Sequence, residues 1–124
     1  MKKHYRIVRG NQISKRRFVW ENKMVAGEIV DTVFGVRLEE GTGWRITHIP
    51  TGFLLVGTYF TTREDAIQFA RITRRMFGDL LETDDIAVLK RIKNDKPEYR
   101  QFYDLKERMN NATGTFSFEE AVNL

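Results

Sequence analysis

The sequence predicts an α+β fold: a small antiparallel sheet with a three-stranded meander, packed against an amphipathic helix and followed by C-terminal helices. Two observations lead to this prediction. Residues 28–60 form three runs rich in β-branched and aromatic residues, separated by short glycine-containing turns, which is typical of a meander. Residues 62–77 then carry apolar side chains at three- and four-residue spacing, which indicates a helix with one apolar face.

The N-terminal quarter carries weaker strand signals. Alternation of apolar and polar side chains predicts a short strand over residues 4–9. The glycine, polar and basic residues of the segment 10–17 favour a loop. Residues 17–20 and 24–25 have aromatic and apolar side chains that favour β structure. We therefore expect short strands, joined by a basic loop, before the meander begins.

The meander is predicted from three apolar runs and two turns. Its first long strand spans residues 28–38, where Ile, Val and Phe dominate. Two glycines within residues 39–43 predict a turn, because glycine adopts positive φ angles without steric cost. A second strand over residues 44–49, a turn at residues 50–52 and a third strand over residues 53–60 complete the prediction.

The helix over residues 62–77 has signals at both ends. Thr61, Thr62 and Glu64 match a capping box, in which a hydroxyl caps a backbone N–H and the glutamate reaches back. Gly78 suits the C-terminal end of this helix. Its apolar face is predicted to consist of Ala66, Phe69, Ala70, Thr73, Met76 and Phe77.

Two further helices are predicted towards the C-terminus. Thr83 and the two acidic residues after it suit a helix start. Ile86, Leu89 and Ile92 give this helix one apolar edge. A proline at the first position predicts another helix over residues 97–109. We expect these helices to lie near the face of the sheet that the first helix leaves open.

Length and composition fit a single domain of 124 residues. We expect residues 28–78 to form its central unit, residues 1–27 basic N-terminal strands and a loop, and residues 79–124 C-terminal helices and a tail. The chain has no cysteine, no apolar run long enough to cross a membrane, and no apolar signal-peptide segment after its basic start. These features favour a cytoplasmic setting.

The net charge of +4 is unevenly distributed along the chain. The first 30 residues hold eight Lys and Arg against two acidic residues, so this quarter carries the whole positive excess. A basic segment attracts polyanions through the release of counterions, and it also keeps a small domain soluble. The charge pattern therefore admits a nucleic-acid partner.

The stretch from Phe34 to Gly78 resembles the plant ethylene-response-factor (Apetala-type) DNA-binding domain in both spacing and residue type. The matching positions are Gly35-Val36-Arg37, Trp44, Gly52, Gly57-Thr58-Tyr59, Thr62-Arg63-Glu64-Asp65-Ala66, Phe69-Ala70, Arg75-Met76 and Gly78. The resemblance implies a three-stranded sheet backed by one helix, and DNA binding. Related sheet-plus-helix domains occur in mobile-element integrases and homing nucleases, and the resemblance to these domains also implies DNA binding.

That family reads the major groove with arginines and tryptophans on the exposed face of its sheet. This chain keeps an arginine, Arg37, at one of the corresponding positions. The other positions hold Phe34, Glu39, Gly41, Thr47, Ile49, Phe53 and Leu55. Most of the contact residues that the resemblance implies are therefore replaced by apolar, small or acidic side chains.

Both faces of the predicted third strand are apolar. Leu54 and Val56 share one face, and Phe53 and Leu55 share the other. Either the N-terminal strands or C-terminal helices cover the second face, or this face binds a protein partner. In the latter case the apolar patch consists of Phe34, Ile49, Phe53 and Leu55.

The sequence predicts no enzyme, cofactor or metal centre. His4 and His48 are the only histidines, and neither has a second His, Cys or acid at metal-ligand spacing. We interpret His48 as a structural residue, because no partner is evident that would orient it for general-base catalysis. The paired acids at 39–40 and 84–85 fall in a turn and at a helix start, which favours structural roles over a two-metal nuclease site. A small nuclease stays as a third hypothesis.

The sequence therefore favours a non-enzymatic binding protein with two candidate partners. The first is nucleic acid, bound through phosphate contacts by a DNA- or RNA-associated regulator. Its candidate residues are Lys15, Arg16, Arg17, Arg37, Arg71, Arg74 and Arg75. The second is a host protein, bound through the apolar patch by a small inhibitor or adaptor of the kind that phages and mobile elements encode. No pattern indicates a membrane partner.

Overall fold

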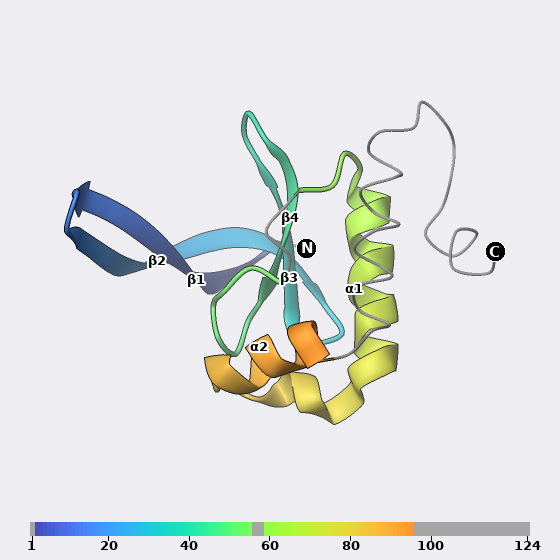
Figure 1. Ribbon diagram of the computed structural model, residues 1–124. Helices are drawn as coiled ribbons and strands as arrows, with labels where there is room; N and C mark the ends of the chain where they lie inside the picture. The colour runs from blue at the N-terminus through green and yellow to red at the C-terminus, as the bar shows by residue number, and fades with distance from the viewer. Residues whose placement is uncertain (1, 56–58, 96–124) are drawn as a thin grey trace.

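The computed structural model describes residues 2–55 and 59–95 (Figure 1). The elements are β1 (Lys3–Ser14), β2 (Arg17–Val30), β3 (Phe34–Glu39), β4 (Gly43–His48), α1 (Arg63–Phe77), the 3₁₀-helix η1 (Gly78–Glu82) and α2 (Ile86–Asp95). The four strands form one antiparallel sheet in the order β1-β2-β3-β4. The predicted α+β class is confirmed. The helix expected over residues 97–109 lies outside the described residues.

Strands β1 and β2 form a long two-stranded ribbon that projects from the rest of the protein (Figure 1). The loop predicted over residues 10–17 is wrong, because β1 continues to Ser14 and β2 resumes at Arg17. Gly10 is not a turn residue; it lies within β1, where a Cβ atom would overlap the ring of Phe18. A glycine inside a strand often marks such a close approach.

A turn divides the long strand that was predicted over residues 28–38. Val30 pairs with Phe34, and the chain reverses between them. Asp31 and Thr32 adopt left-handed φ angles of 50° and 65°. Aspartate tolerates this region, whereas a β-branched threonine rarely adopts it, so the sequence carries little signal of this turn.

The described residues of the segment predicted as the third strand of the meander pair with β4 in antiparallel orientation. Leu54 pairs with Thr47 and Phe60 pairs with Trp44, each as an isolated bridge. Before it, the chain turns at Gly52, whose φ angle is 78° and whose carbonyl oxygen accepts a 2.8 Å hydrogen bond from the backbone N–H of Val8. At this turn the chain therefore returns to β1.

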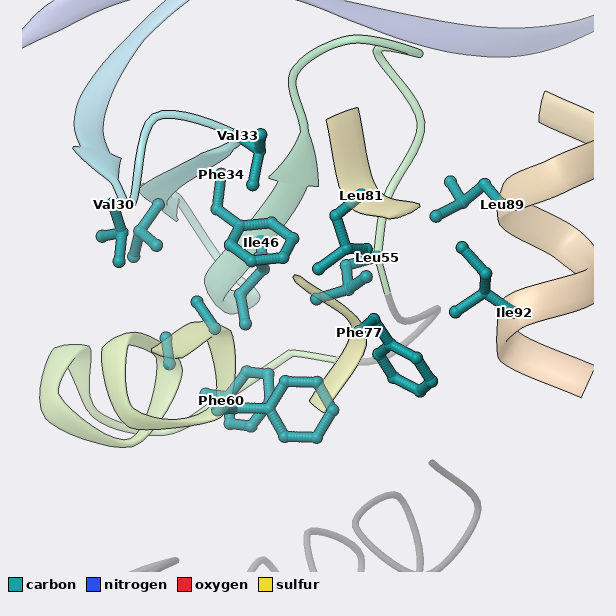
Figure 2. Close-up of a cluster of buried hydrophobic side chains, with 14 residues drawn as sticks. Val30, Val33, Phe34, Ile46, Leu55, Phe60, Phe77, Leu81, Leu89 and Ile92 are labelled. Carbon is teal, nitrogen blue, oxygen red and sulfur yellow. The ribbon is translucent and has the colours of Figure 1, made fainter. Parts of the chain in front are cut away.

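The main hydrophobic core lies between one face of the sheet and α1 (Figure 2). The sheet contributes Val30, Phe34, Val36 and Ile46, and α1 contributes Ala66, Phe69, Ala70 and Phe77. Leu81 of η1 and Leu89 and Ile92 of α2 complete the same cluster. The expectation that α2 lies near the opposite face is therefore wrong, because its apolar edge joins the core on which α1 packs.

Helix α1 ends at Gly78 as the sequence predicts, but its N-terminal cap is Thr62 and not the predicted capping box of Thr61 and Glu64, whose carboxylate pairs with Arg63. The hydroxyl of Thr62 accepts a hydrogen bond from the backbone N–H of Asp65 at 3.2 Å. At the other end Gly78 has a φ angle of 55°, and its N–H bonds to the carbonyl oxygen of Arg74. In α2, the carboxylate of Asp85 accepts a bond from the N–H of Ala87 at 2.9 Å, which fixes the start of that helix.

Tyr5 of β1 covers the opposite face of the sheet. Its side chain is only 4% exposed, and Cβ atoms at Gly27 of β2 or Gly35 of β3 would overlap it. Successive residues of a strand point to opposite faces, so Gly35 faces away from the cluster that contains Phe34 and Val36. The ring of Tyr5 thus spans three strands over two glycines and attaches the base of the ribbon to the sheet.

Burial raises the pKa of the Tyr5 phenol to about 12, and Arg37 and Thr47 offset only part of this effect. Within the part of the chain that the structure describes, no group lies at normal hydrogen-bonding geometry to the phenolic oxygen. Ionising this phenol inside the fold is therefore unfavourable.

We predict that Gly35→Ala lowers the free energy of unfolding by about 2 kcal/mol, because the new methyl group displaces the Tyr5 ring. Urea denaturation measures the change. In a Tyr5→Ala background the same substitution should have a much smaller effect. An equal penalty in both backgrounds would contradict the contact.

We also predict that alkaline pH destabilises the protein through Tyr5. In the unfolded chain this phenol ionises near its ordinary pKa of 10, whereas in the folded protein its pKa is about 12. Between these values only the unfolded state releases the proton, so the free energy of unfolding falls by about 2 kcal/mol as pH rises. Denaturation at a series of pH values should show a smaller decline in Tyr5→Phe, whereas the exposed control Tyr59→Phe should behave like the wild type.

Candidate nucleic-acid interface

The outer half of the ribbon is surrounded by solvent. Every side chain from Gln12 to Phe18 is exposed, and the two strands are joined by a turn at Lys15 and Arg16. The register between the strands shifts near this turn. The structure therefore places the predicted residues Lys15, Arg16 and Arg17 together at the tip of a projecting element.

Further cations follow the ribbon towards its base. Between residues 2 and 24 the chain has one acidic side chain, Glu21. The basic side chains of this segment, all exposed, are Lys2, Lys3, Arg6, Arg9, Lys15, Arg16, Arg17 and Lys23. Arg6 also donates to the carbonyl oxygen of Pro50 at 3.4 Å. Sequence reasoning missed Arg6, Arg9 and Lys23, because short strands and a loop do not predict one continuous basic ribbon.

Two exposed aromatic residues lie on the ribbon among these cations. Phe18 and Trp20 share one face of β2, and their ring centroids are 4.8 Å apart in an edge-to-face arrangement. Trp20 makes a second edge-to-face contact, at 5.2 Å, with Phe53. Their spacing of two residues is a signal that sequence analysis could have used.

The three arginines predicted on α1 lie elsewhere. Arg71, Arg74 and Arg75 line a shallow hollow of about 520 Å³ together with Asp31 and Thr32. The side chain of Arg74 bonds within the fold, to the Gly78 carbonyl oxygen at 2.9 Å and to Glu82 at 3.2 Å. Because the ribbon projects away from α1 (Figure 1), these arginines and the ribbon tip do not form one compact surface.

Arg37, the arginine kept from the family resemblance, is largely buried and paired. Its guanidinium lies 3.4 Å from the carboxylate of Glu39, which also accepts from Arg45 at 3.3 Å. Nearby, Arg63 binds Glu28 through two hydrogen bonds of 2.5 and 2.6 Å. This pair holds the pKa of Glu28 below its ordinary value and raises that of Arg63. Arg37 and Arg63 line a hollow of about 470 Å³, but carboxylates already neutralise both.

The proposed apolar patch does not form a surface. Phe34 and Leu55 are fully buried in the main core, while Ile49 and Phe53 are half-buried. The prediction of this four-residue patch is therefore wrong. The patch does not form because Leu55 belongs to the core beside β4, where its backbone N–H bonds to the carbonyl oxygen of Ile46 at 2.9 Å.

His48 is buried and bonded at both ring nitrogens. Its Nε2 lies 2.5 Å from the carbonyl oxygen of Leu81, and its Nδ1 lies 2.9 Å from the hydroxyl of Thr51. A carbonyl only accepts, so Nε2 carries a proton and donates to Leu81, while Nδ1 and the Thr51 hydroxyl share the second hydrogen bond. The interpretation of His48 as a structural residue is consistent with this geometry, which joins β4 to η1.

Among residues 2–55 and 59–95, no group of three or more His, Cys, Asp and Glu side chains is arranged to hold a metal ion. No helix in the same part of the chain is long and apolar enough to cross a membrane. The protein matches no family model, no curated protein and no solved structure. The resemblance to the plant DNA-binding domain therefore stays a prediction.

We predict that His48→Phe lowers the free energy of unfolding by about 2 kcal/mol, because it leaves the buried carbonyl of Leu81 without its donor. The matched control is His4→Phe, since His4 is exposed on β1 and its replacement should change stability little. Thermal and urea denaturation of both variants measure the difference. Equal effects at the two positions would argue against the structural role.

Proposed function

We propose that this protein is a non-enzymatic nucleic-acid-binding protein that uses the β1-β2 ribbon as its binding element. The observation that carries the proposal is the charge of this ribbon, with seven exposed cations against one acidic side chain between residues 3 and 24. Cations on a nucleic-acid-binding surface displace the counterions of the phosphate backbone, which supplies much of the affinity.

The shape of the ribbon supports the same proposal. A two-stranded antiparallel ribbon is narrow enough to enter a groove or follow a single strand of nucleic acid. The ribbon keeps its three tip cations beyond the hydrophobic core, with exposed side chains throughout the outer half. An isolated ribbon of this length gains little stability from its own side chains, so its projection is more readily explained by contact with a partner.

Other surfaces of the chain support this function less well. Arg37 and Arg63 are paired with carboxylates, and Arg74 bonds to Glu82. The absence of cysteine in the sequence fits a cytoplasmic setting, where nucleic acid is accessible. A regulator that associates with DNA or RNA is the role that we infer from these features.

We predict that replacing Lys15, Arg16 and Arg17 together by Gln weakens nucleic-acid binding by about tenfold or more at low salt. It should also reduce the slope of log affinity against log salt concentration by about 2 to 3, since each phosphate contact contributes roughly 0.7 to 0.9. Fluorescence anisotropy with labelled oligonucleotides across a salt series measures both quantities.

The matched control for this experiment is the double variant with Lys90→Gln and Arg91→Glu. Both residues are exposed on α2, so the control makes the same change in net charge, a loss of three positive charges, away from the ribbon. It should alter affinity less than about twofold. Equal losses of affinity in both variants would mean that overall charge, and not the ribbon, determines binding. No binding of the wild-type protein at low salt would overturn the proposed function.

A further inference from the structure

The aromatic pair on the ribbon has a geometry that simple phosphate binding does not need. Phe18 and Trp20 are 55% and 59% exposed, although large aromatic side chains are normally well buried. They lie two residues apart on β2, so both point to the same face of the ribbon. This face therefore carries two adjacent aromatic rings within a segment dominated by cations.

The backbone and neighbouring rings already hold this pair in place. The ring of Phe18 lies against Gly10, so closely that a Cβ atom there would overlap it. The tip of the ring, at Cζ, therefore lies against the backbone of β1, while the residue as a whole stays 55% exposed. Trp20 packs edge-to-face on Phe53 at 5.2 Å. Rings that are ordered before binding lose less conformational entropy when a ligand stacks on them.

The segment that carries Phe53 is itself tied to the ribbon. The N–H of Val8 donates to the carbonyl oxygen of Gly52 at 2.8 Å, one residue before Phe53. Gly52 also has no room for a side chain, since a Cβ atom would lie 2.9 Å from Cγ2 of Val8. The aromatic pair is therefore supported from β1 on one side and from the segment after β4 on the other.

We infer that Phe18 and Trp20 form a stacking platform for unpaired bases, and that the partner of the ribbon is single-stranded nucleic acid. This inference rests on the proposed function and deepens it. Aromatic rings among cations are the usual means of binding a single strand, because bases stack on the rings while Lys and Arg contact the phosphates. Lys15, Arg16 and Arg17 lie next to Phe18 in the chain and supply those phosphate contacts.

A paired duplex suits this surface less well. The faces of its bases are covered by stacking, and proteins that open a duplex insert an apolar wedge between base steps. Here the extremity of the ribbon is the charged turn at Lys15 and Arg16, whereas Phe18 and Trp20 lie back from it on one face of β2. The platform therefore favours bases that are already unpaired.

The test compares four probes of about twelve nucleotides, a length within the range that single-strand-binding domains cover. They are a single-stranded DNA, an RNA of the same sequence, the DNA duplex, and an abasic DNA strand with the same number of phosphates. Anisotropy titrations at one salt concentration should give affinities for a base-bearing single strand at least about tenfold above those for the duplex and the abasic strand. The DNA and RNA arms identify which single strand is preferred.

Variants of the platform give the second arm of the test. Phe18→Ala and Trp20→Ala should each weaken binding of the preferred single strand by about 5- to 100-fold and leave binding of the abasic strand unchanged. Phe18→Tyr and Trp20→Phe retain a stacking ring and should restore most of the affinity. Leu80→Ala is the matched control, because Leu80 is 53% exposed but lies on η1, outside the ribbon. Unchanged melting temperatures verify that each variant is folded.

Four outcomes would overturn the inference. Equal affinity for the abasic and base-bearing strands, with no effect of the alanine variants, would mean that phosphate contacts alone account for binding. The proposed function would then stand without the stacking platform. Tighter binding of the duplex would make the aromatic pair part of a groove contact. Concentration-dependent self-association in sedimentation that Trp20→Ala abolishes would make the platform a contact between copies of the chain. Failure of all four probes to bind at low salt would instead overturn the proposed function as well.

Discussion

The ring of Tyr5 on Gly27 and Gly35 is the contact that joins the two parts of this molecule. On one face of the sheet, α1, η1 and α2 close a conventional hydrophobic core. On the other face, the base of the ribbon depends on one aromatic ring that lies against three strands, with room for it provided by two glycines. Because larger residues at either glycine would displace the ring, the attachment of the ribbon depends on the absence of side chains as much as on their presence.

The same physical principle recurs along the ribbon. Phe18 lies over Gly10 as Tyr5 lies over Gly27 and Gly35, so glycines inside strands accommodate rings rather than reverse the chain. At the base the ring is buried and attaches the ribbon to the sheet, whereas near the tip the ring is exposed and available to a ligand. The two contacts thus connect folding at one end of the ribbon with the proposed recognition of nucleic acid at the other.

Sequence reasoning succeeded where local signals are strong and failed where tertiary contacts decide. The Thr62 cap, the period of α1 and the stop at Gly78 are local, and they predicted that helix closely. The ribbon was missed because Gly10 resembles a turn residue, and because its real turn at Lys15 and Arg16 lacks the usual Asn or Gly. The basic tip was predicted from composition. The exposure of Phe18 and Trp20 on one face of the ribbon, however, becomes evident only once both strands are known to extend beyond the core.

The hydrogen bond between Val8 and Gly52 separates two parts of the ribbon that are held by different contacts. Towards the sheet, Val8 and Tyr5 clamp β1; beyond Val8, the strands are supported mainly by their own ladder and by the contact between Trp20 and Phe53. The ribbon is therefore held by contacts at its base, whereas its tip projects without support from the rest of the protein. Because the core cluster around α1 contains no residue of β1, the outer part of the ribbon is the part of the sheet that this core supports least.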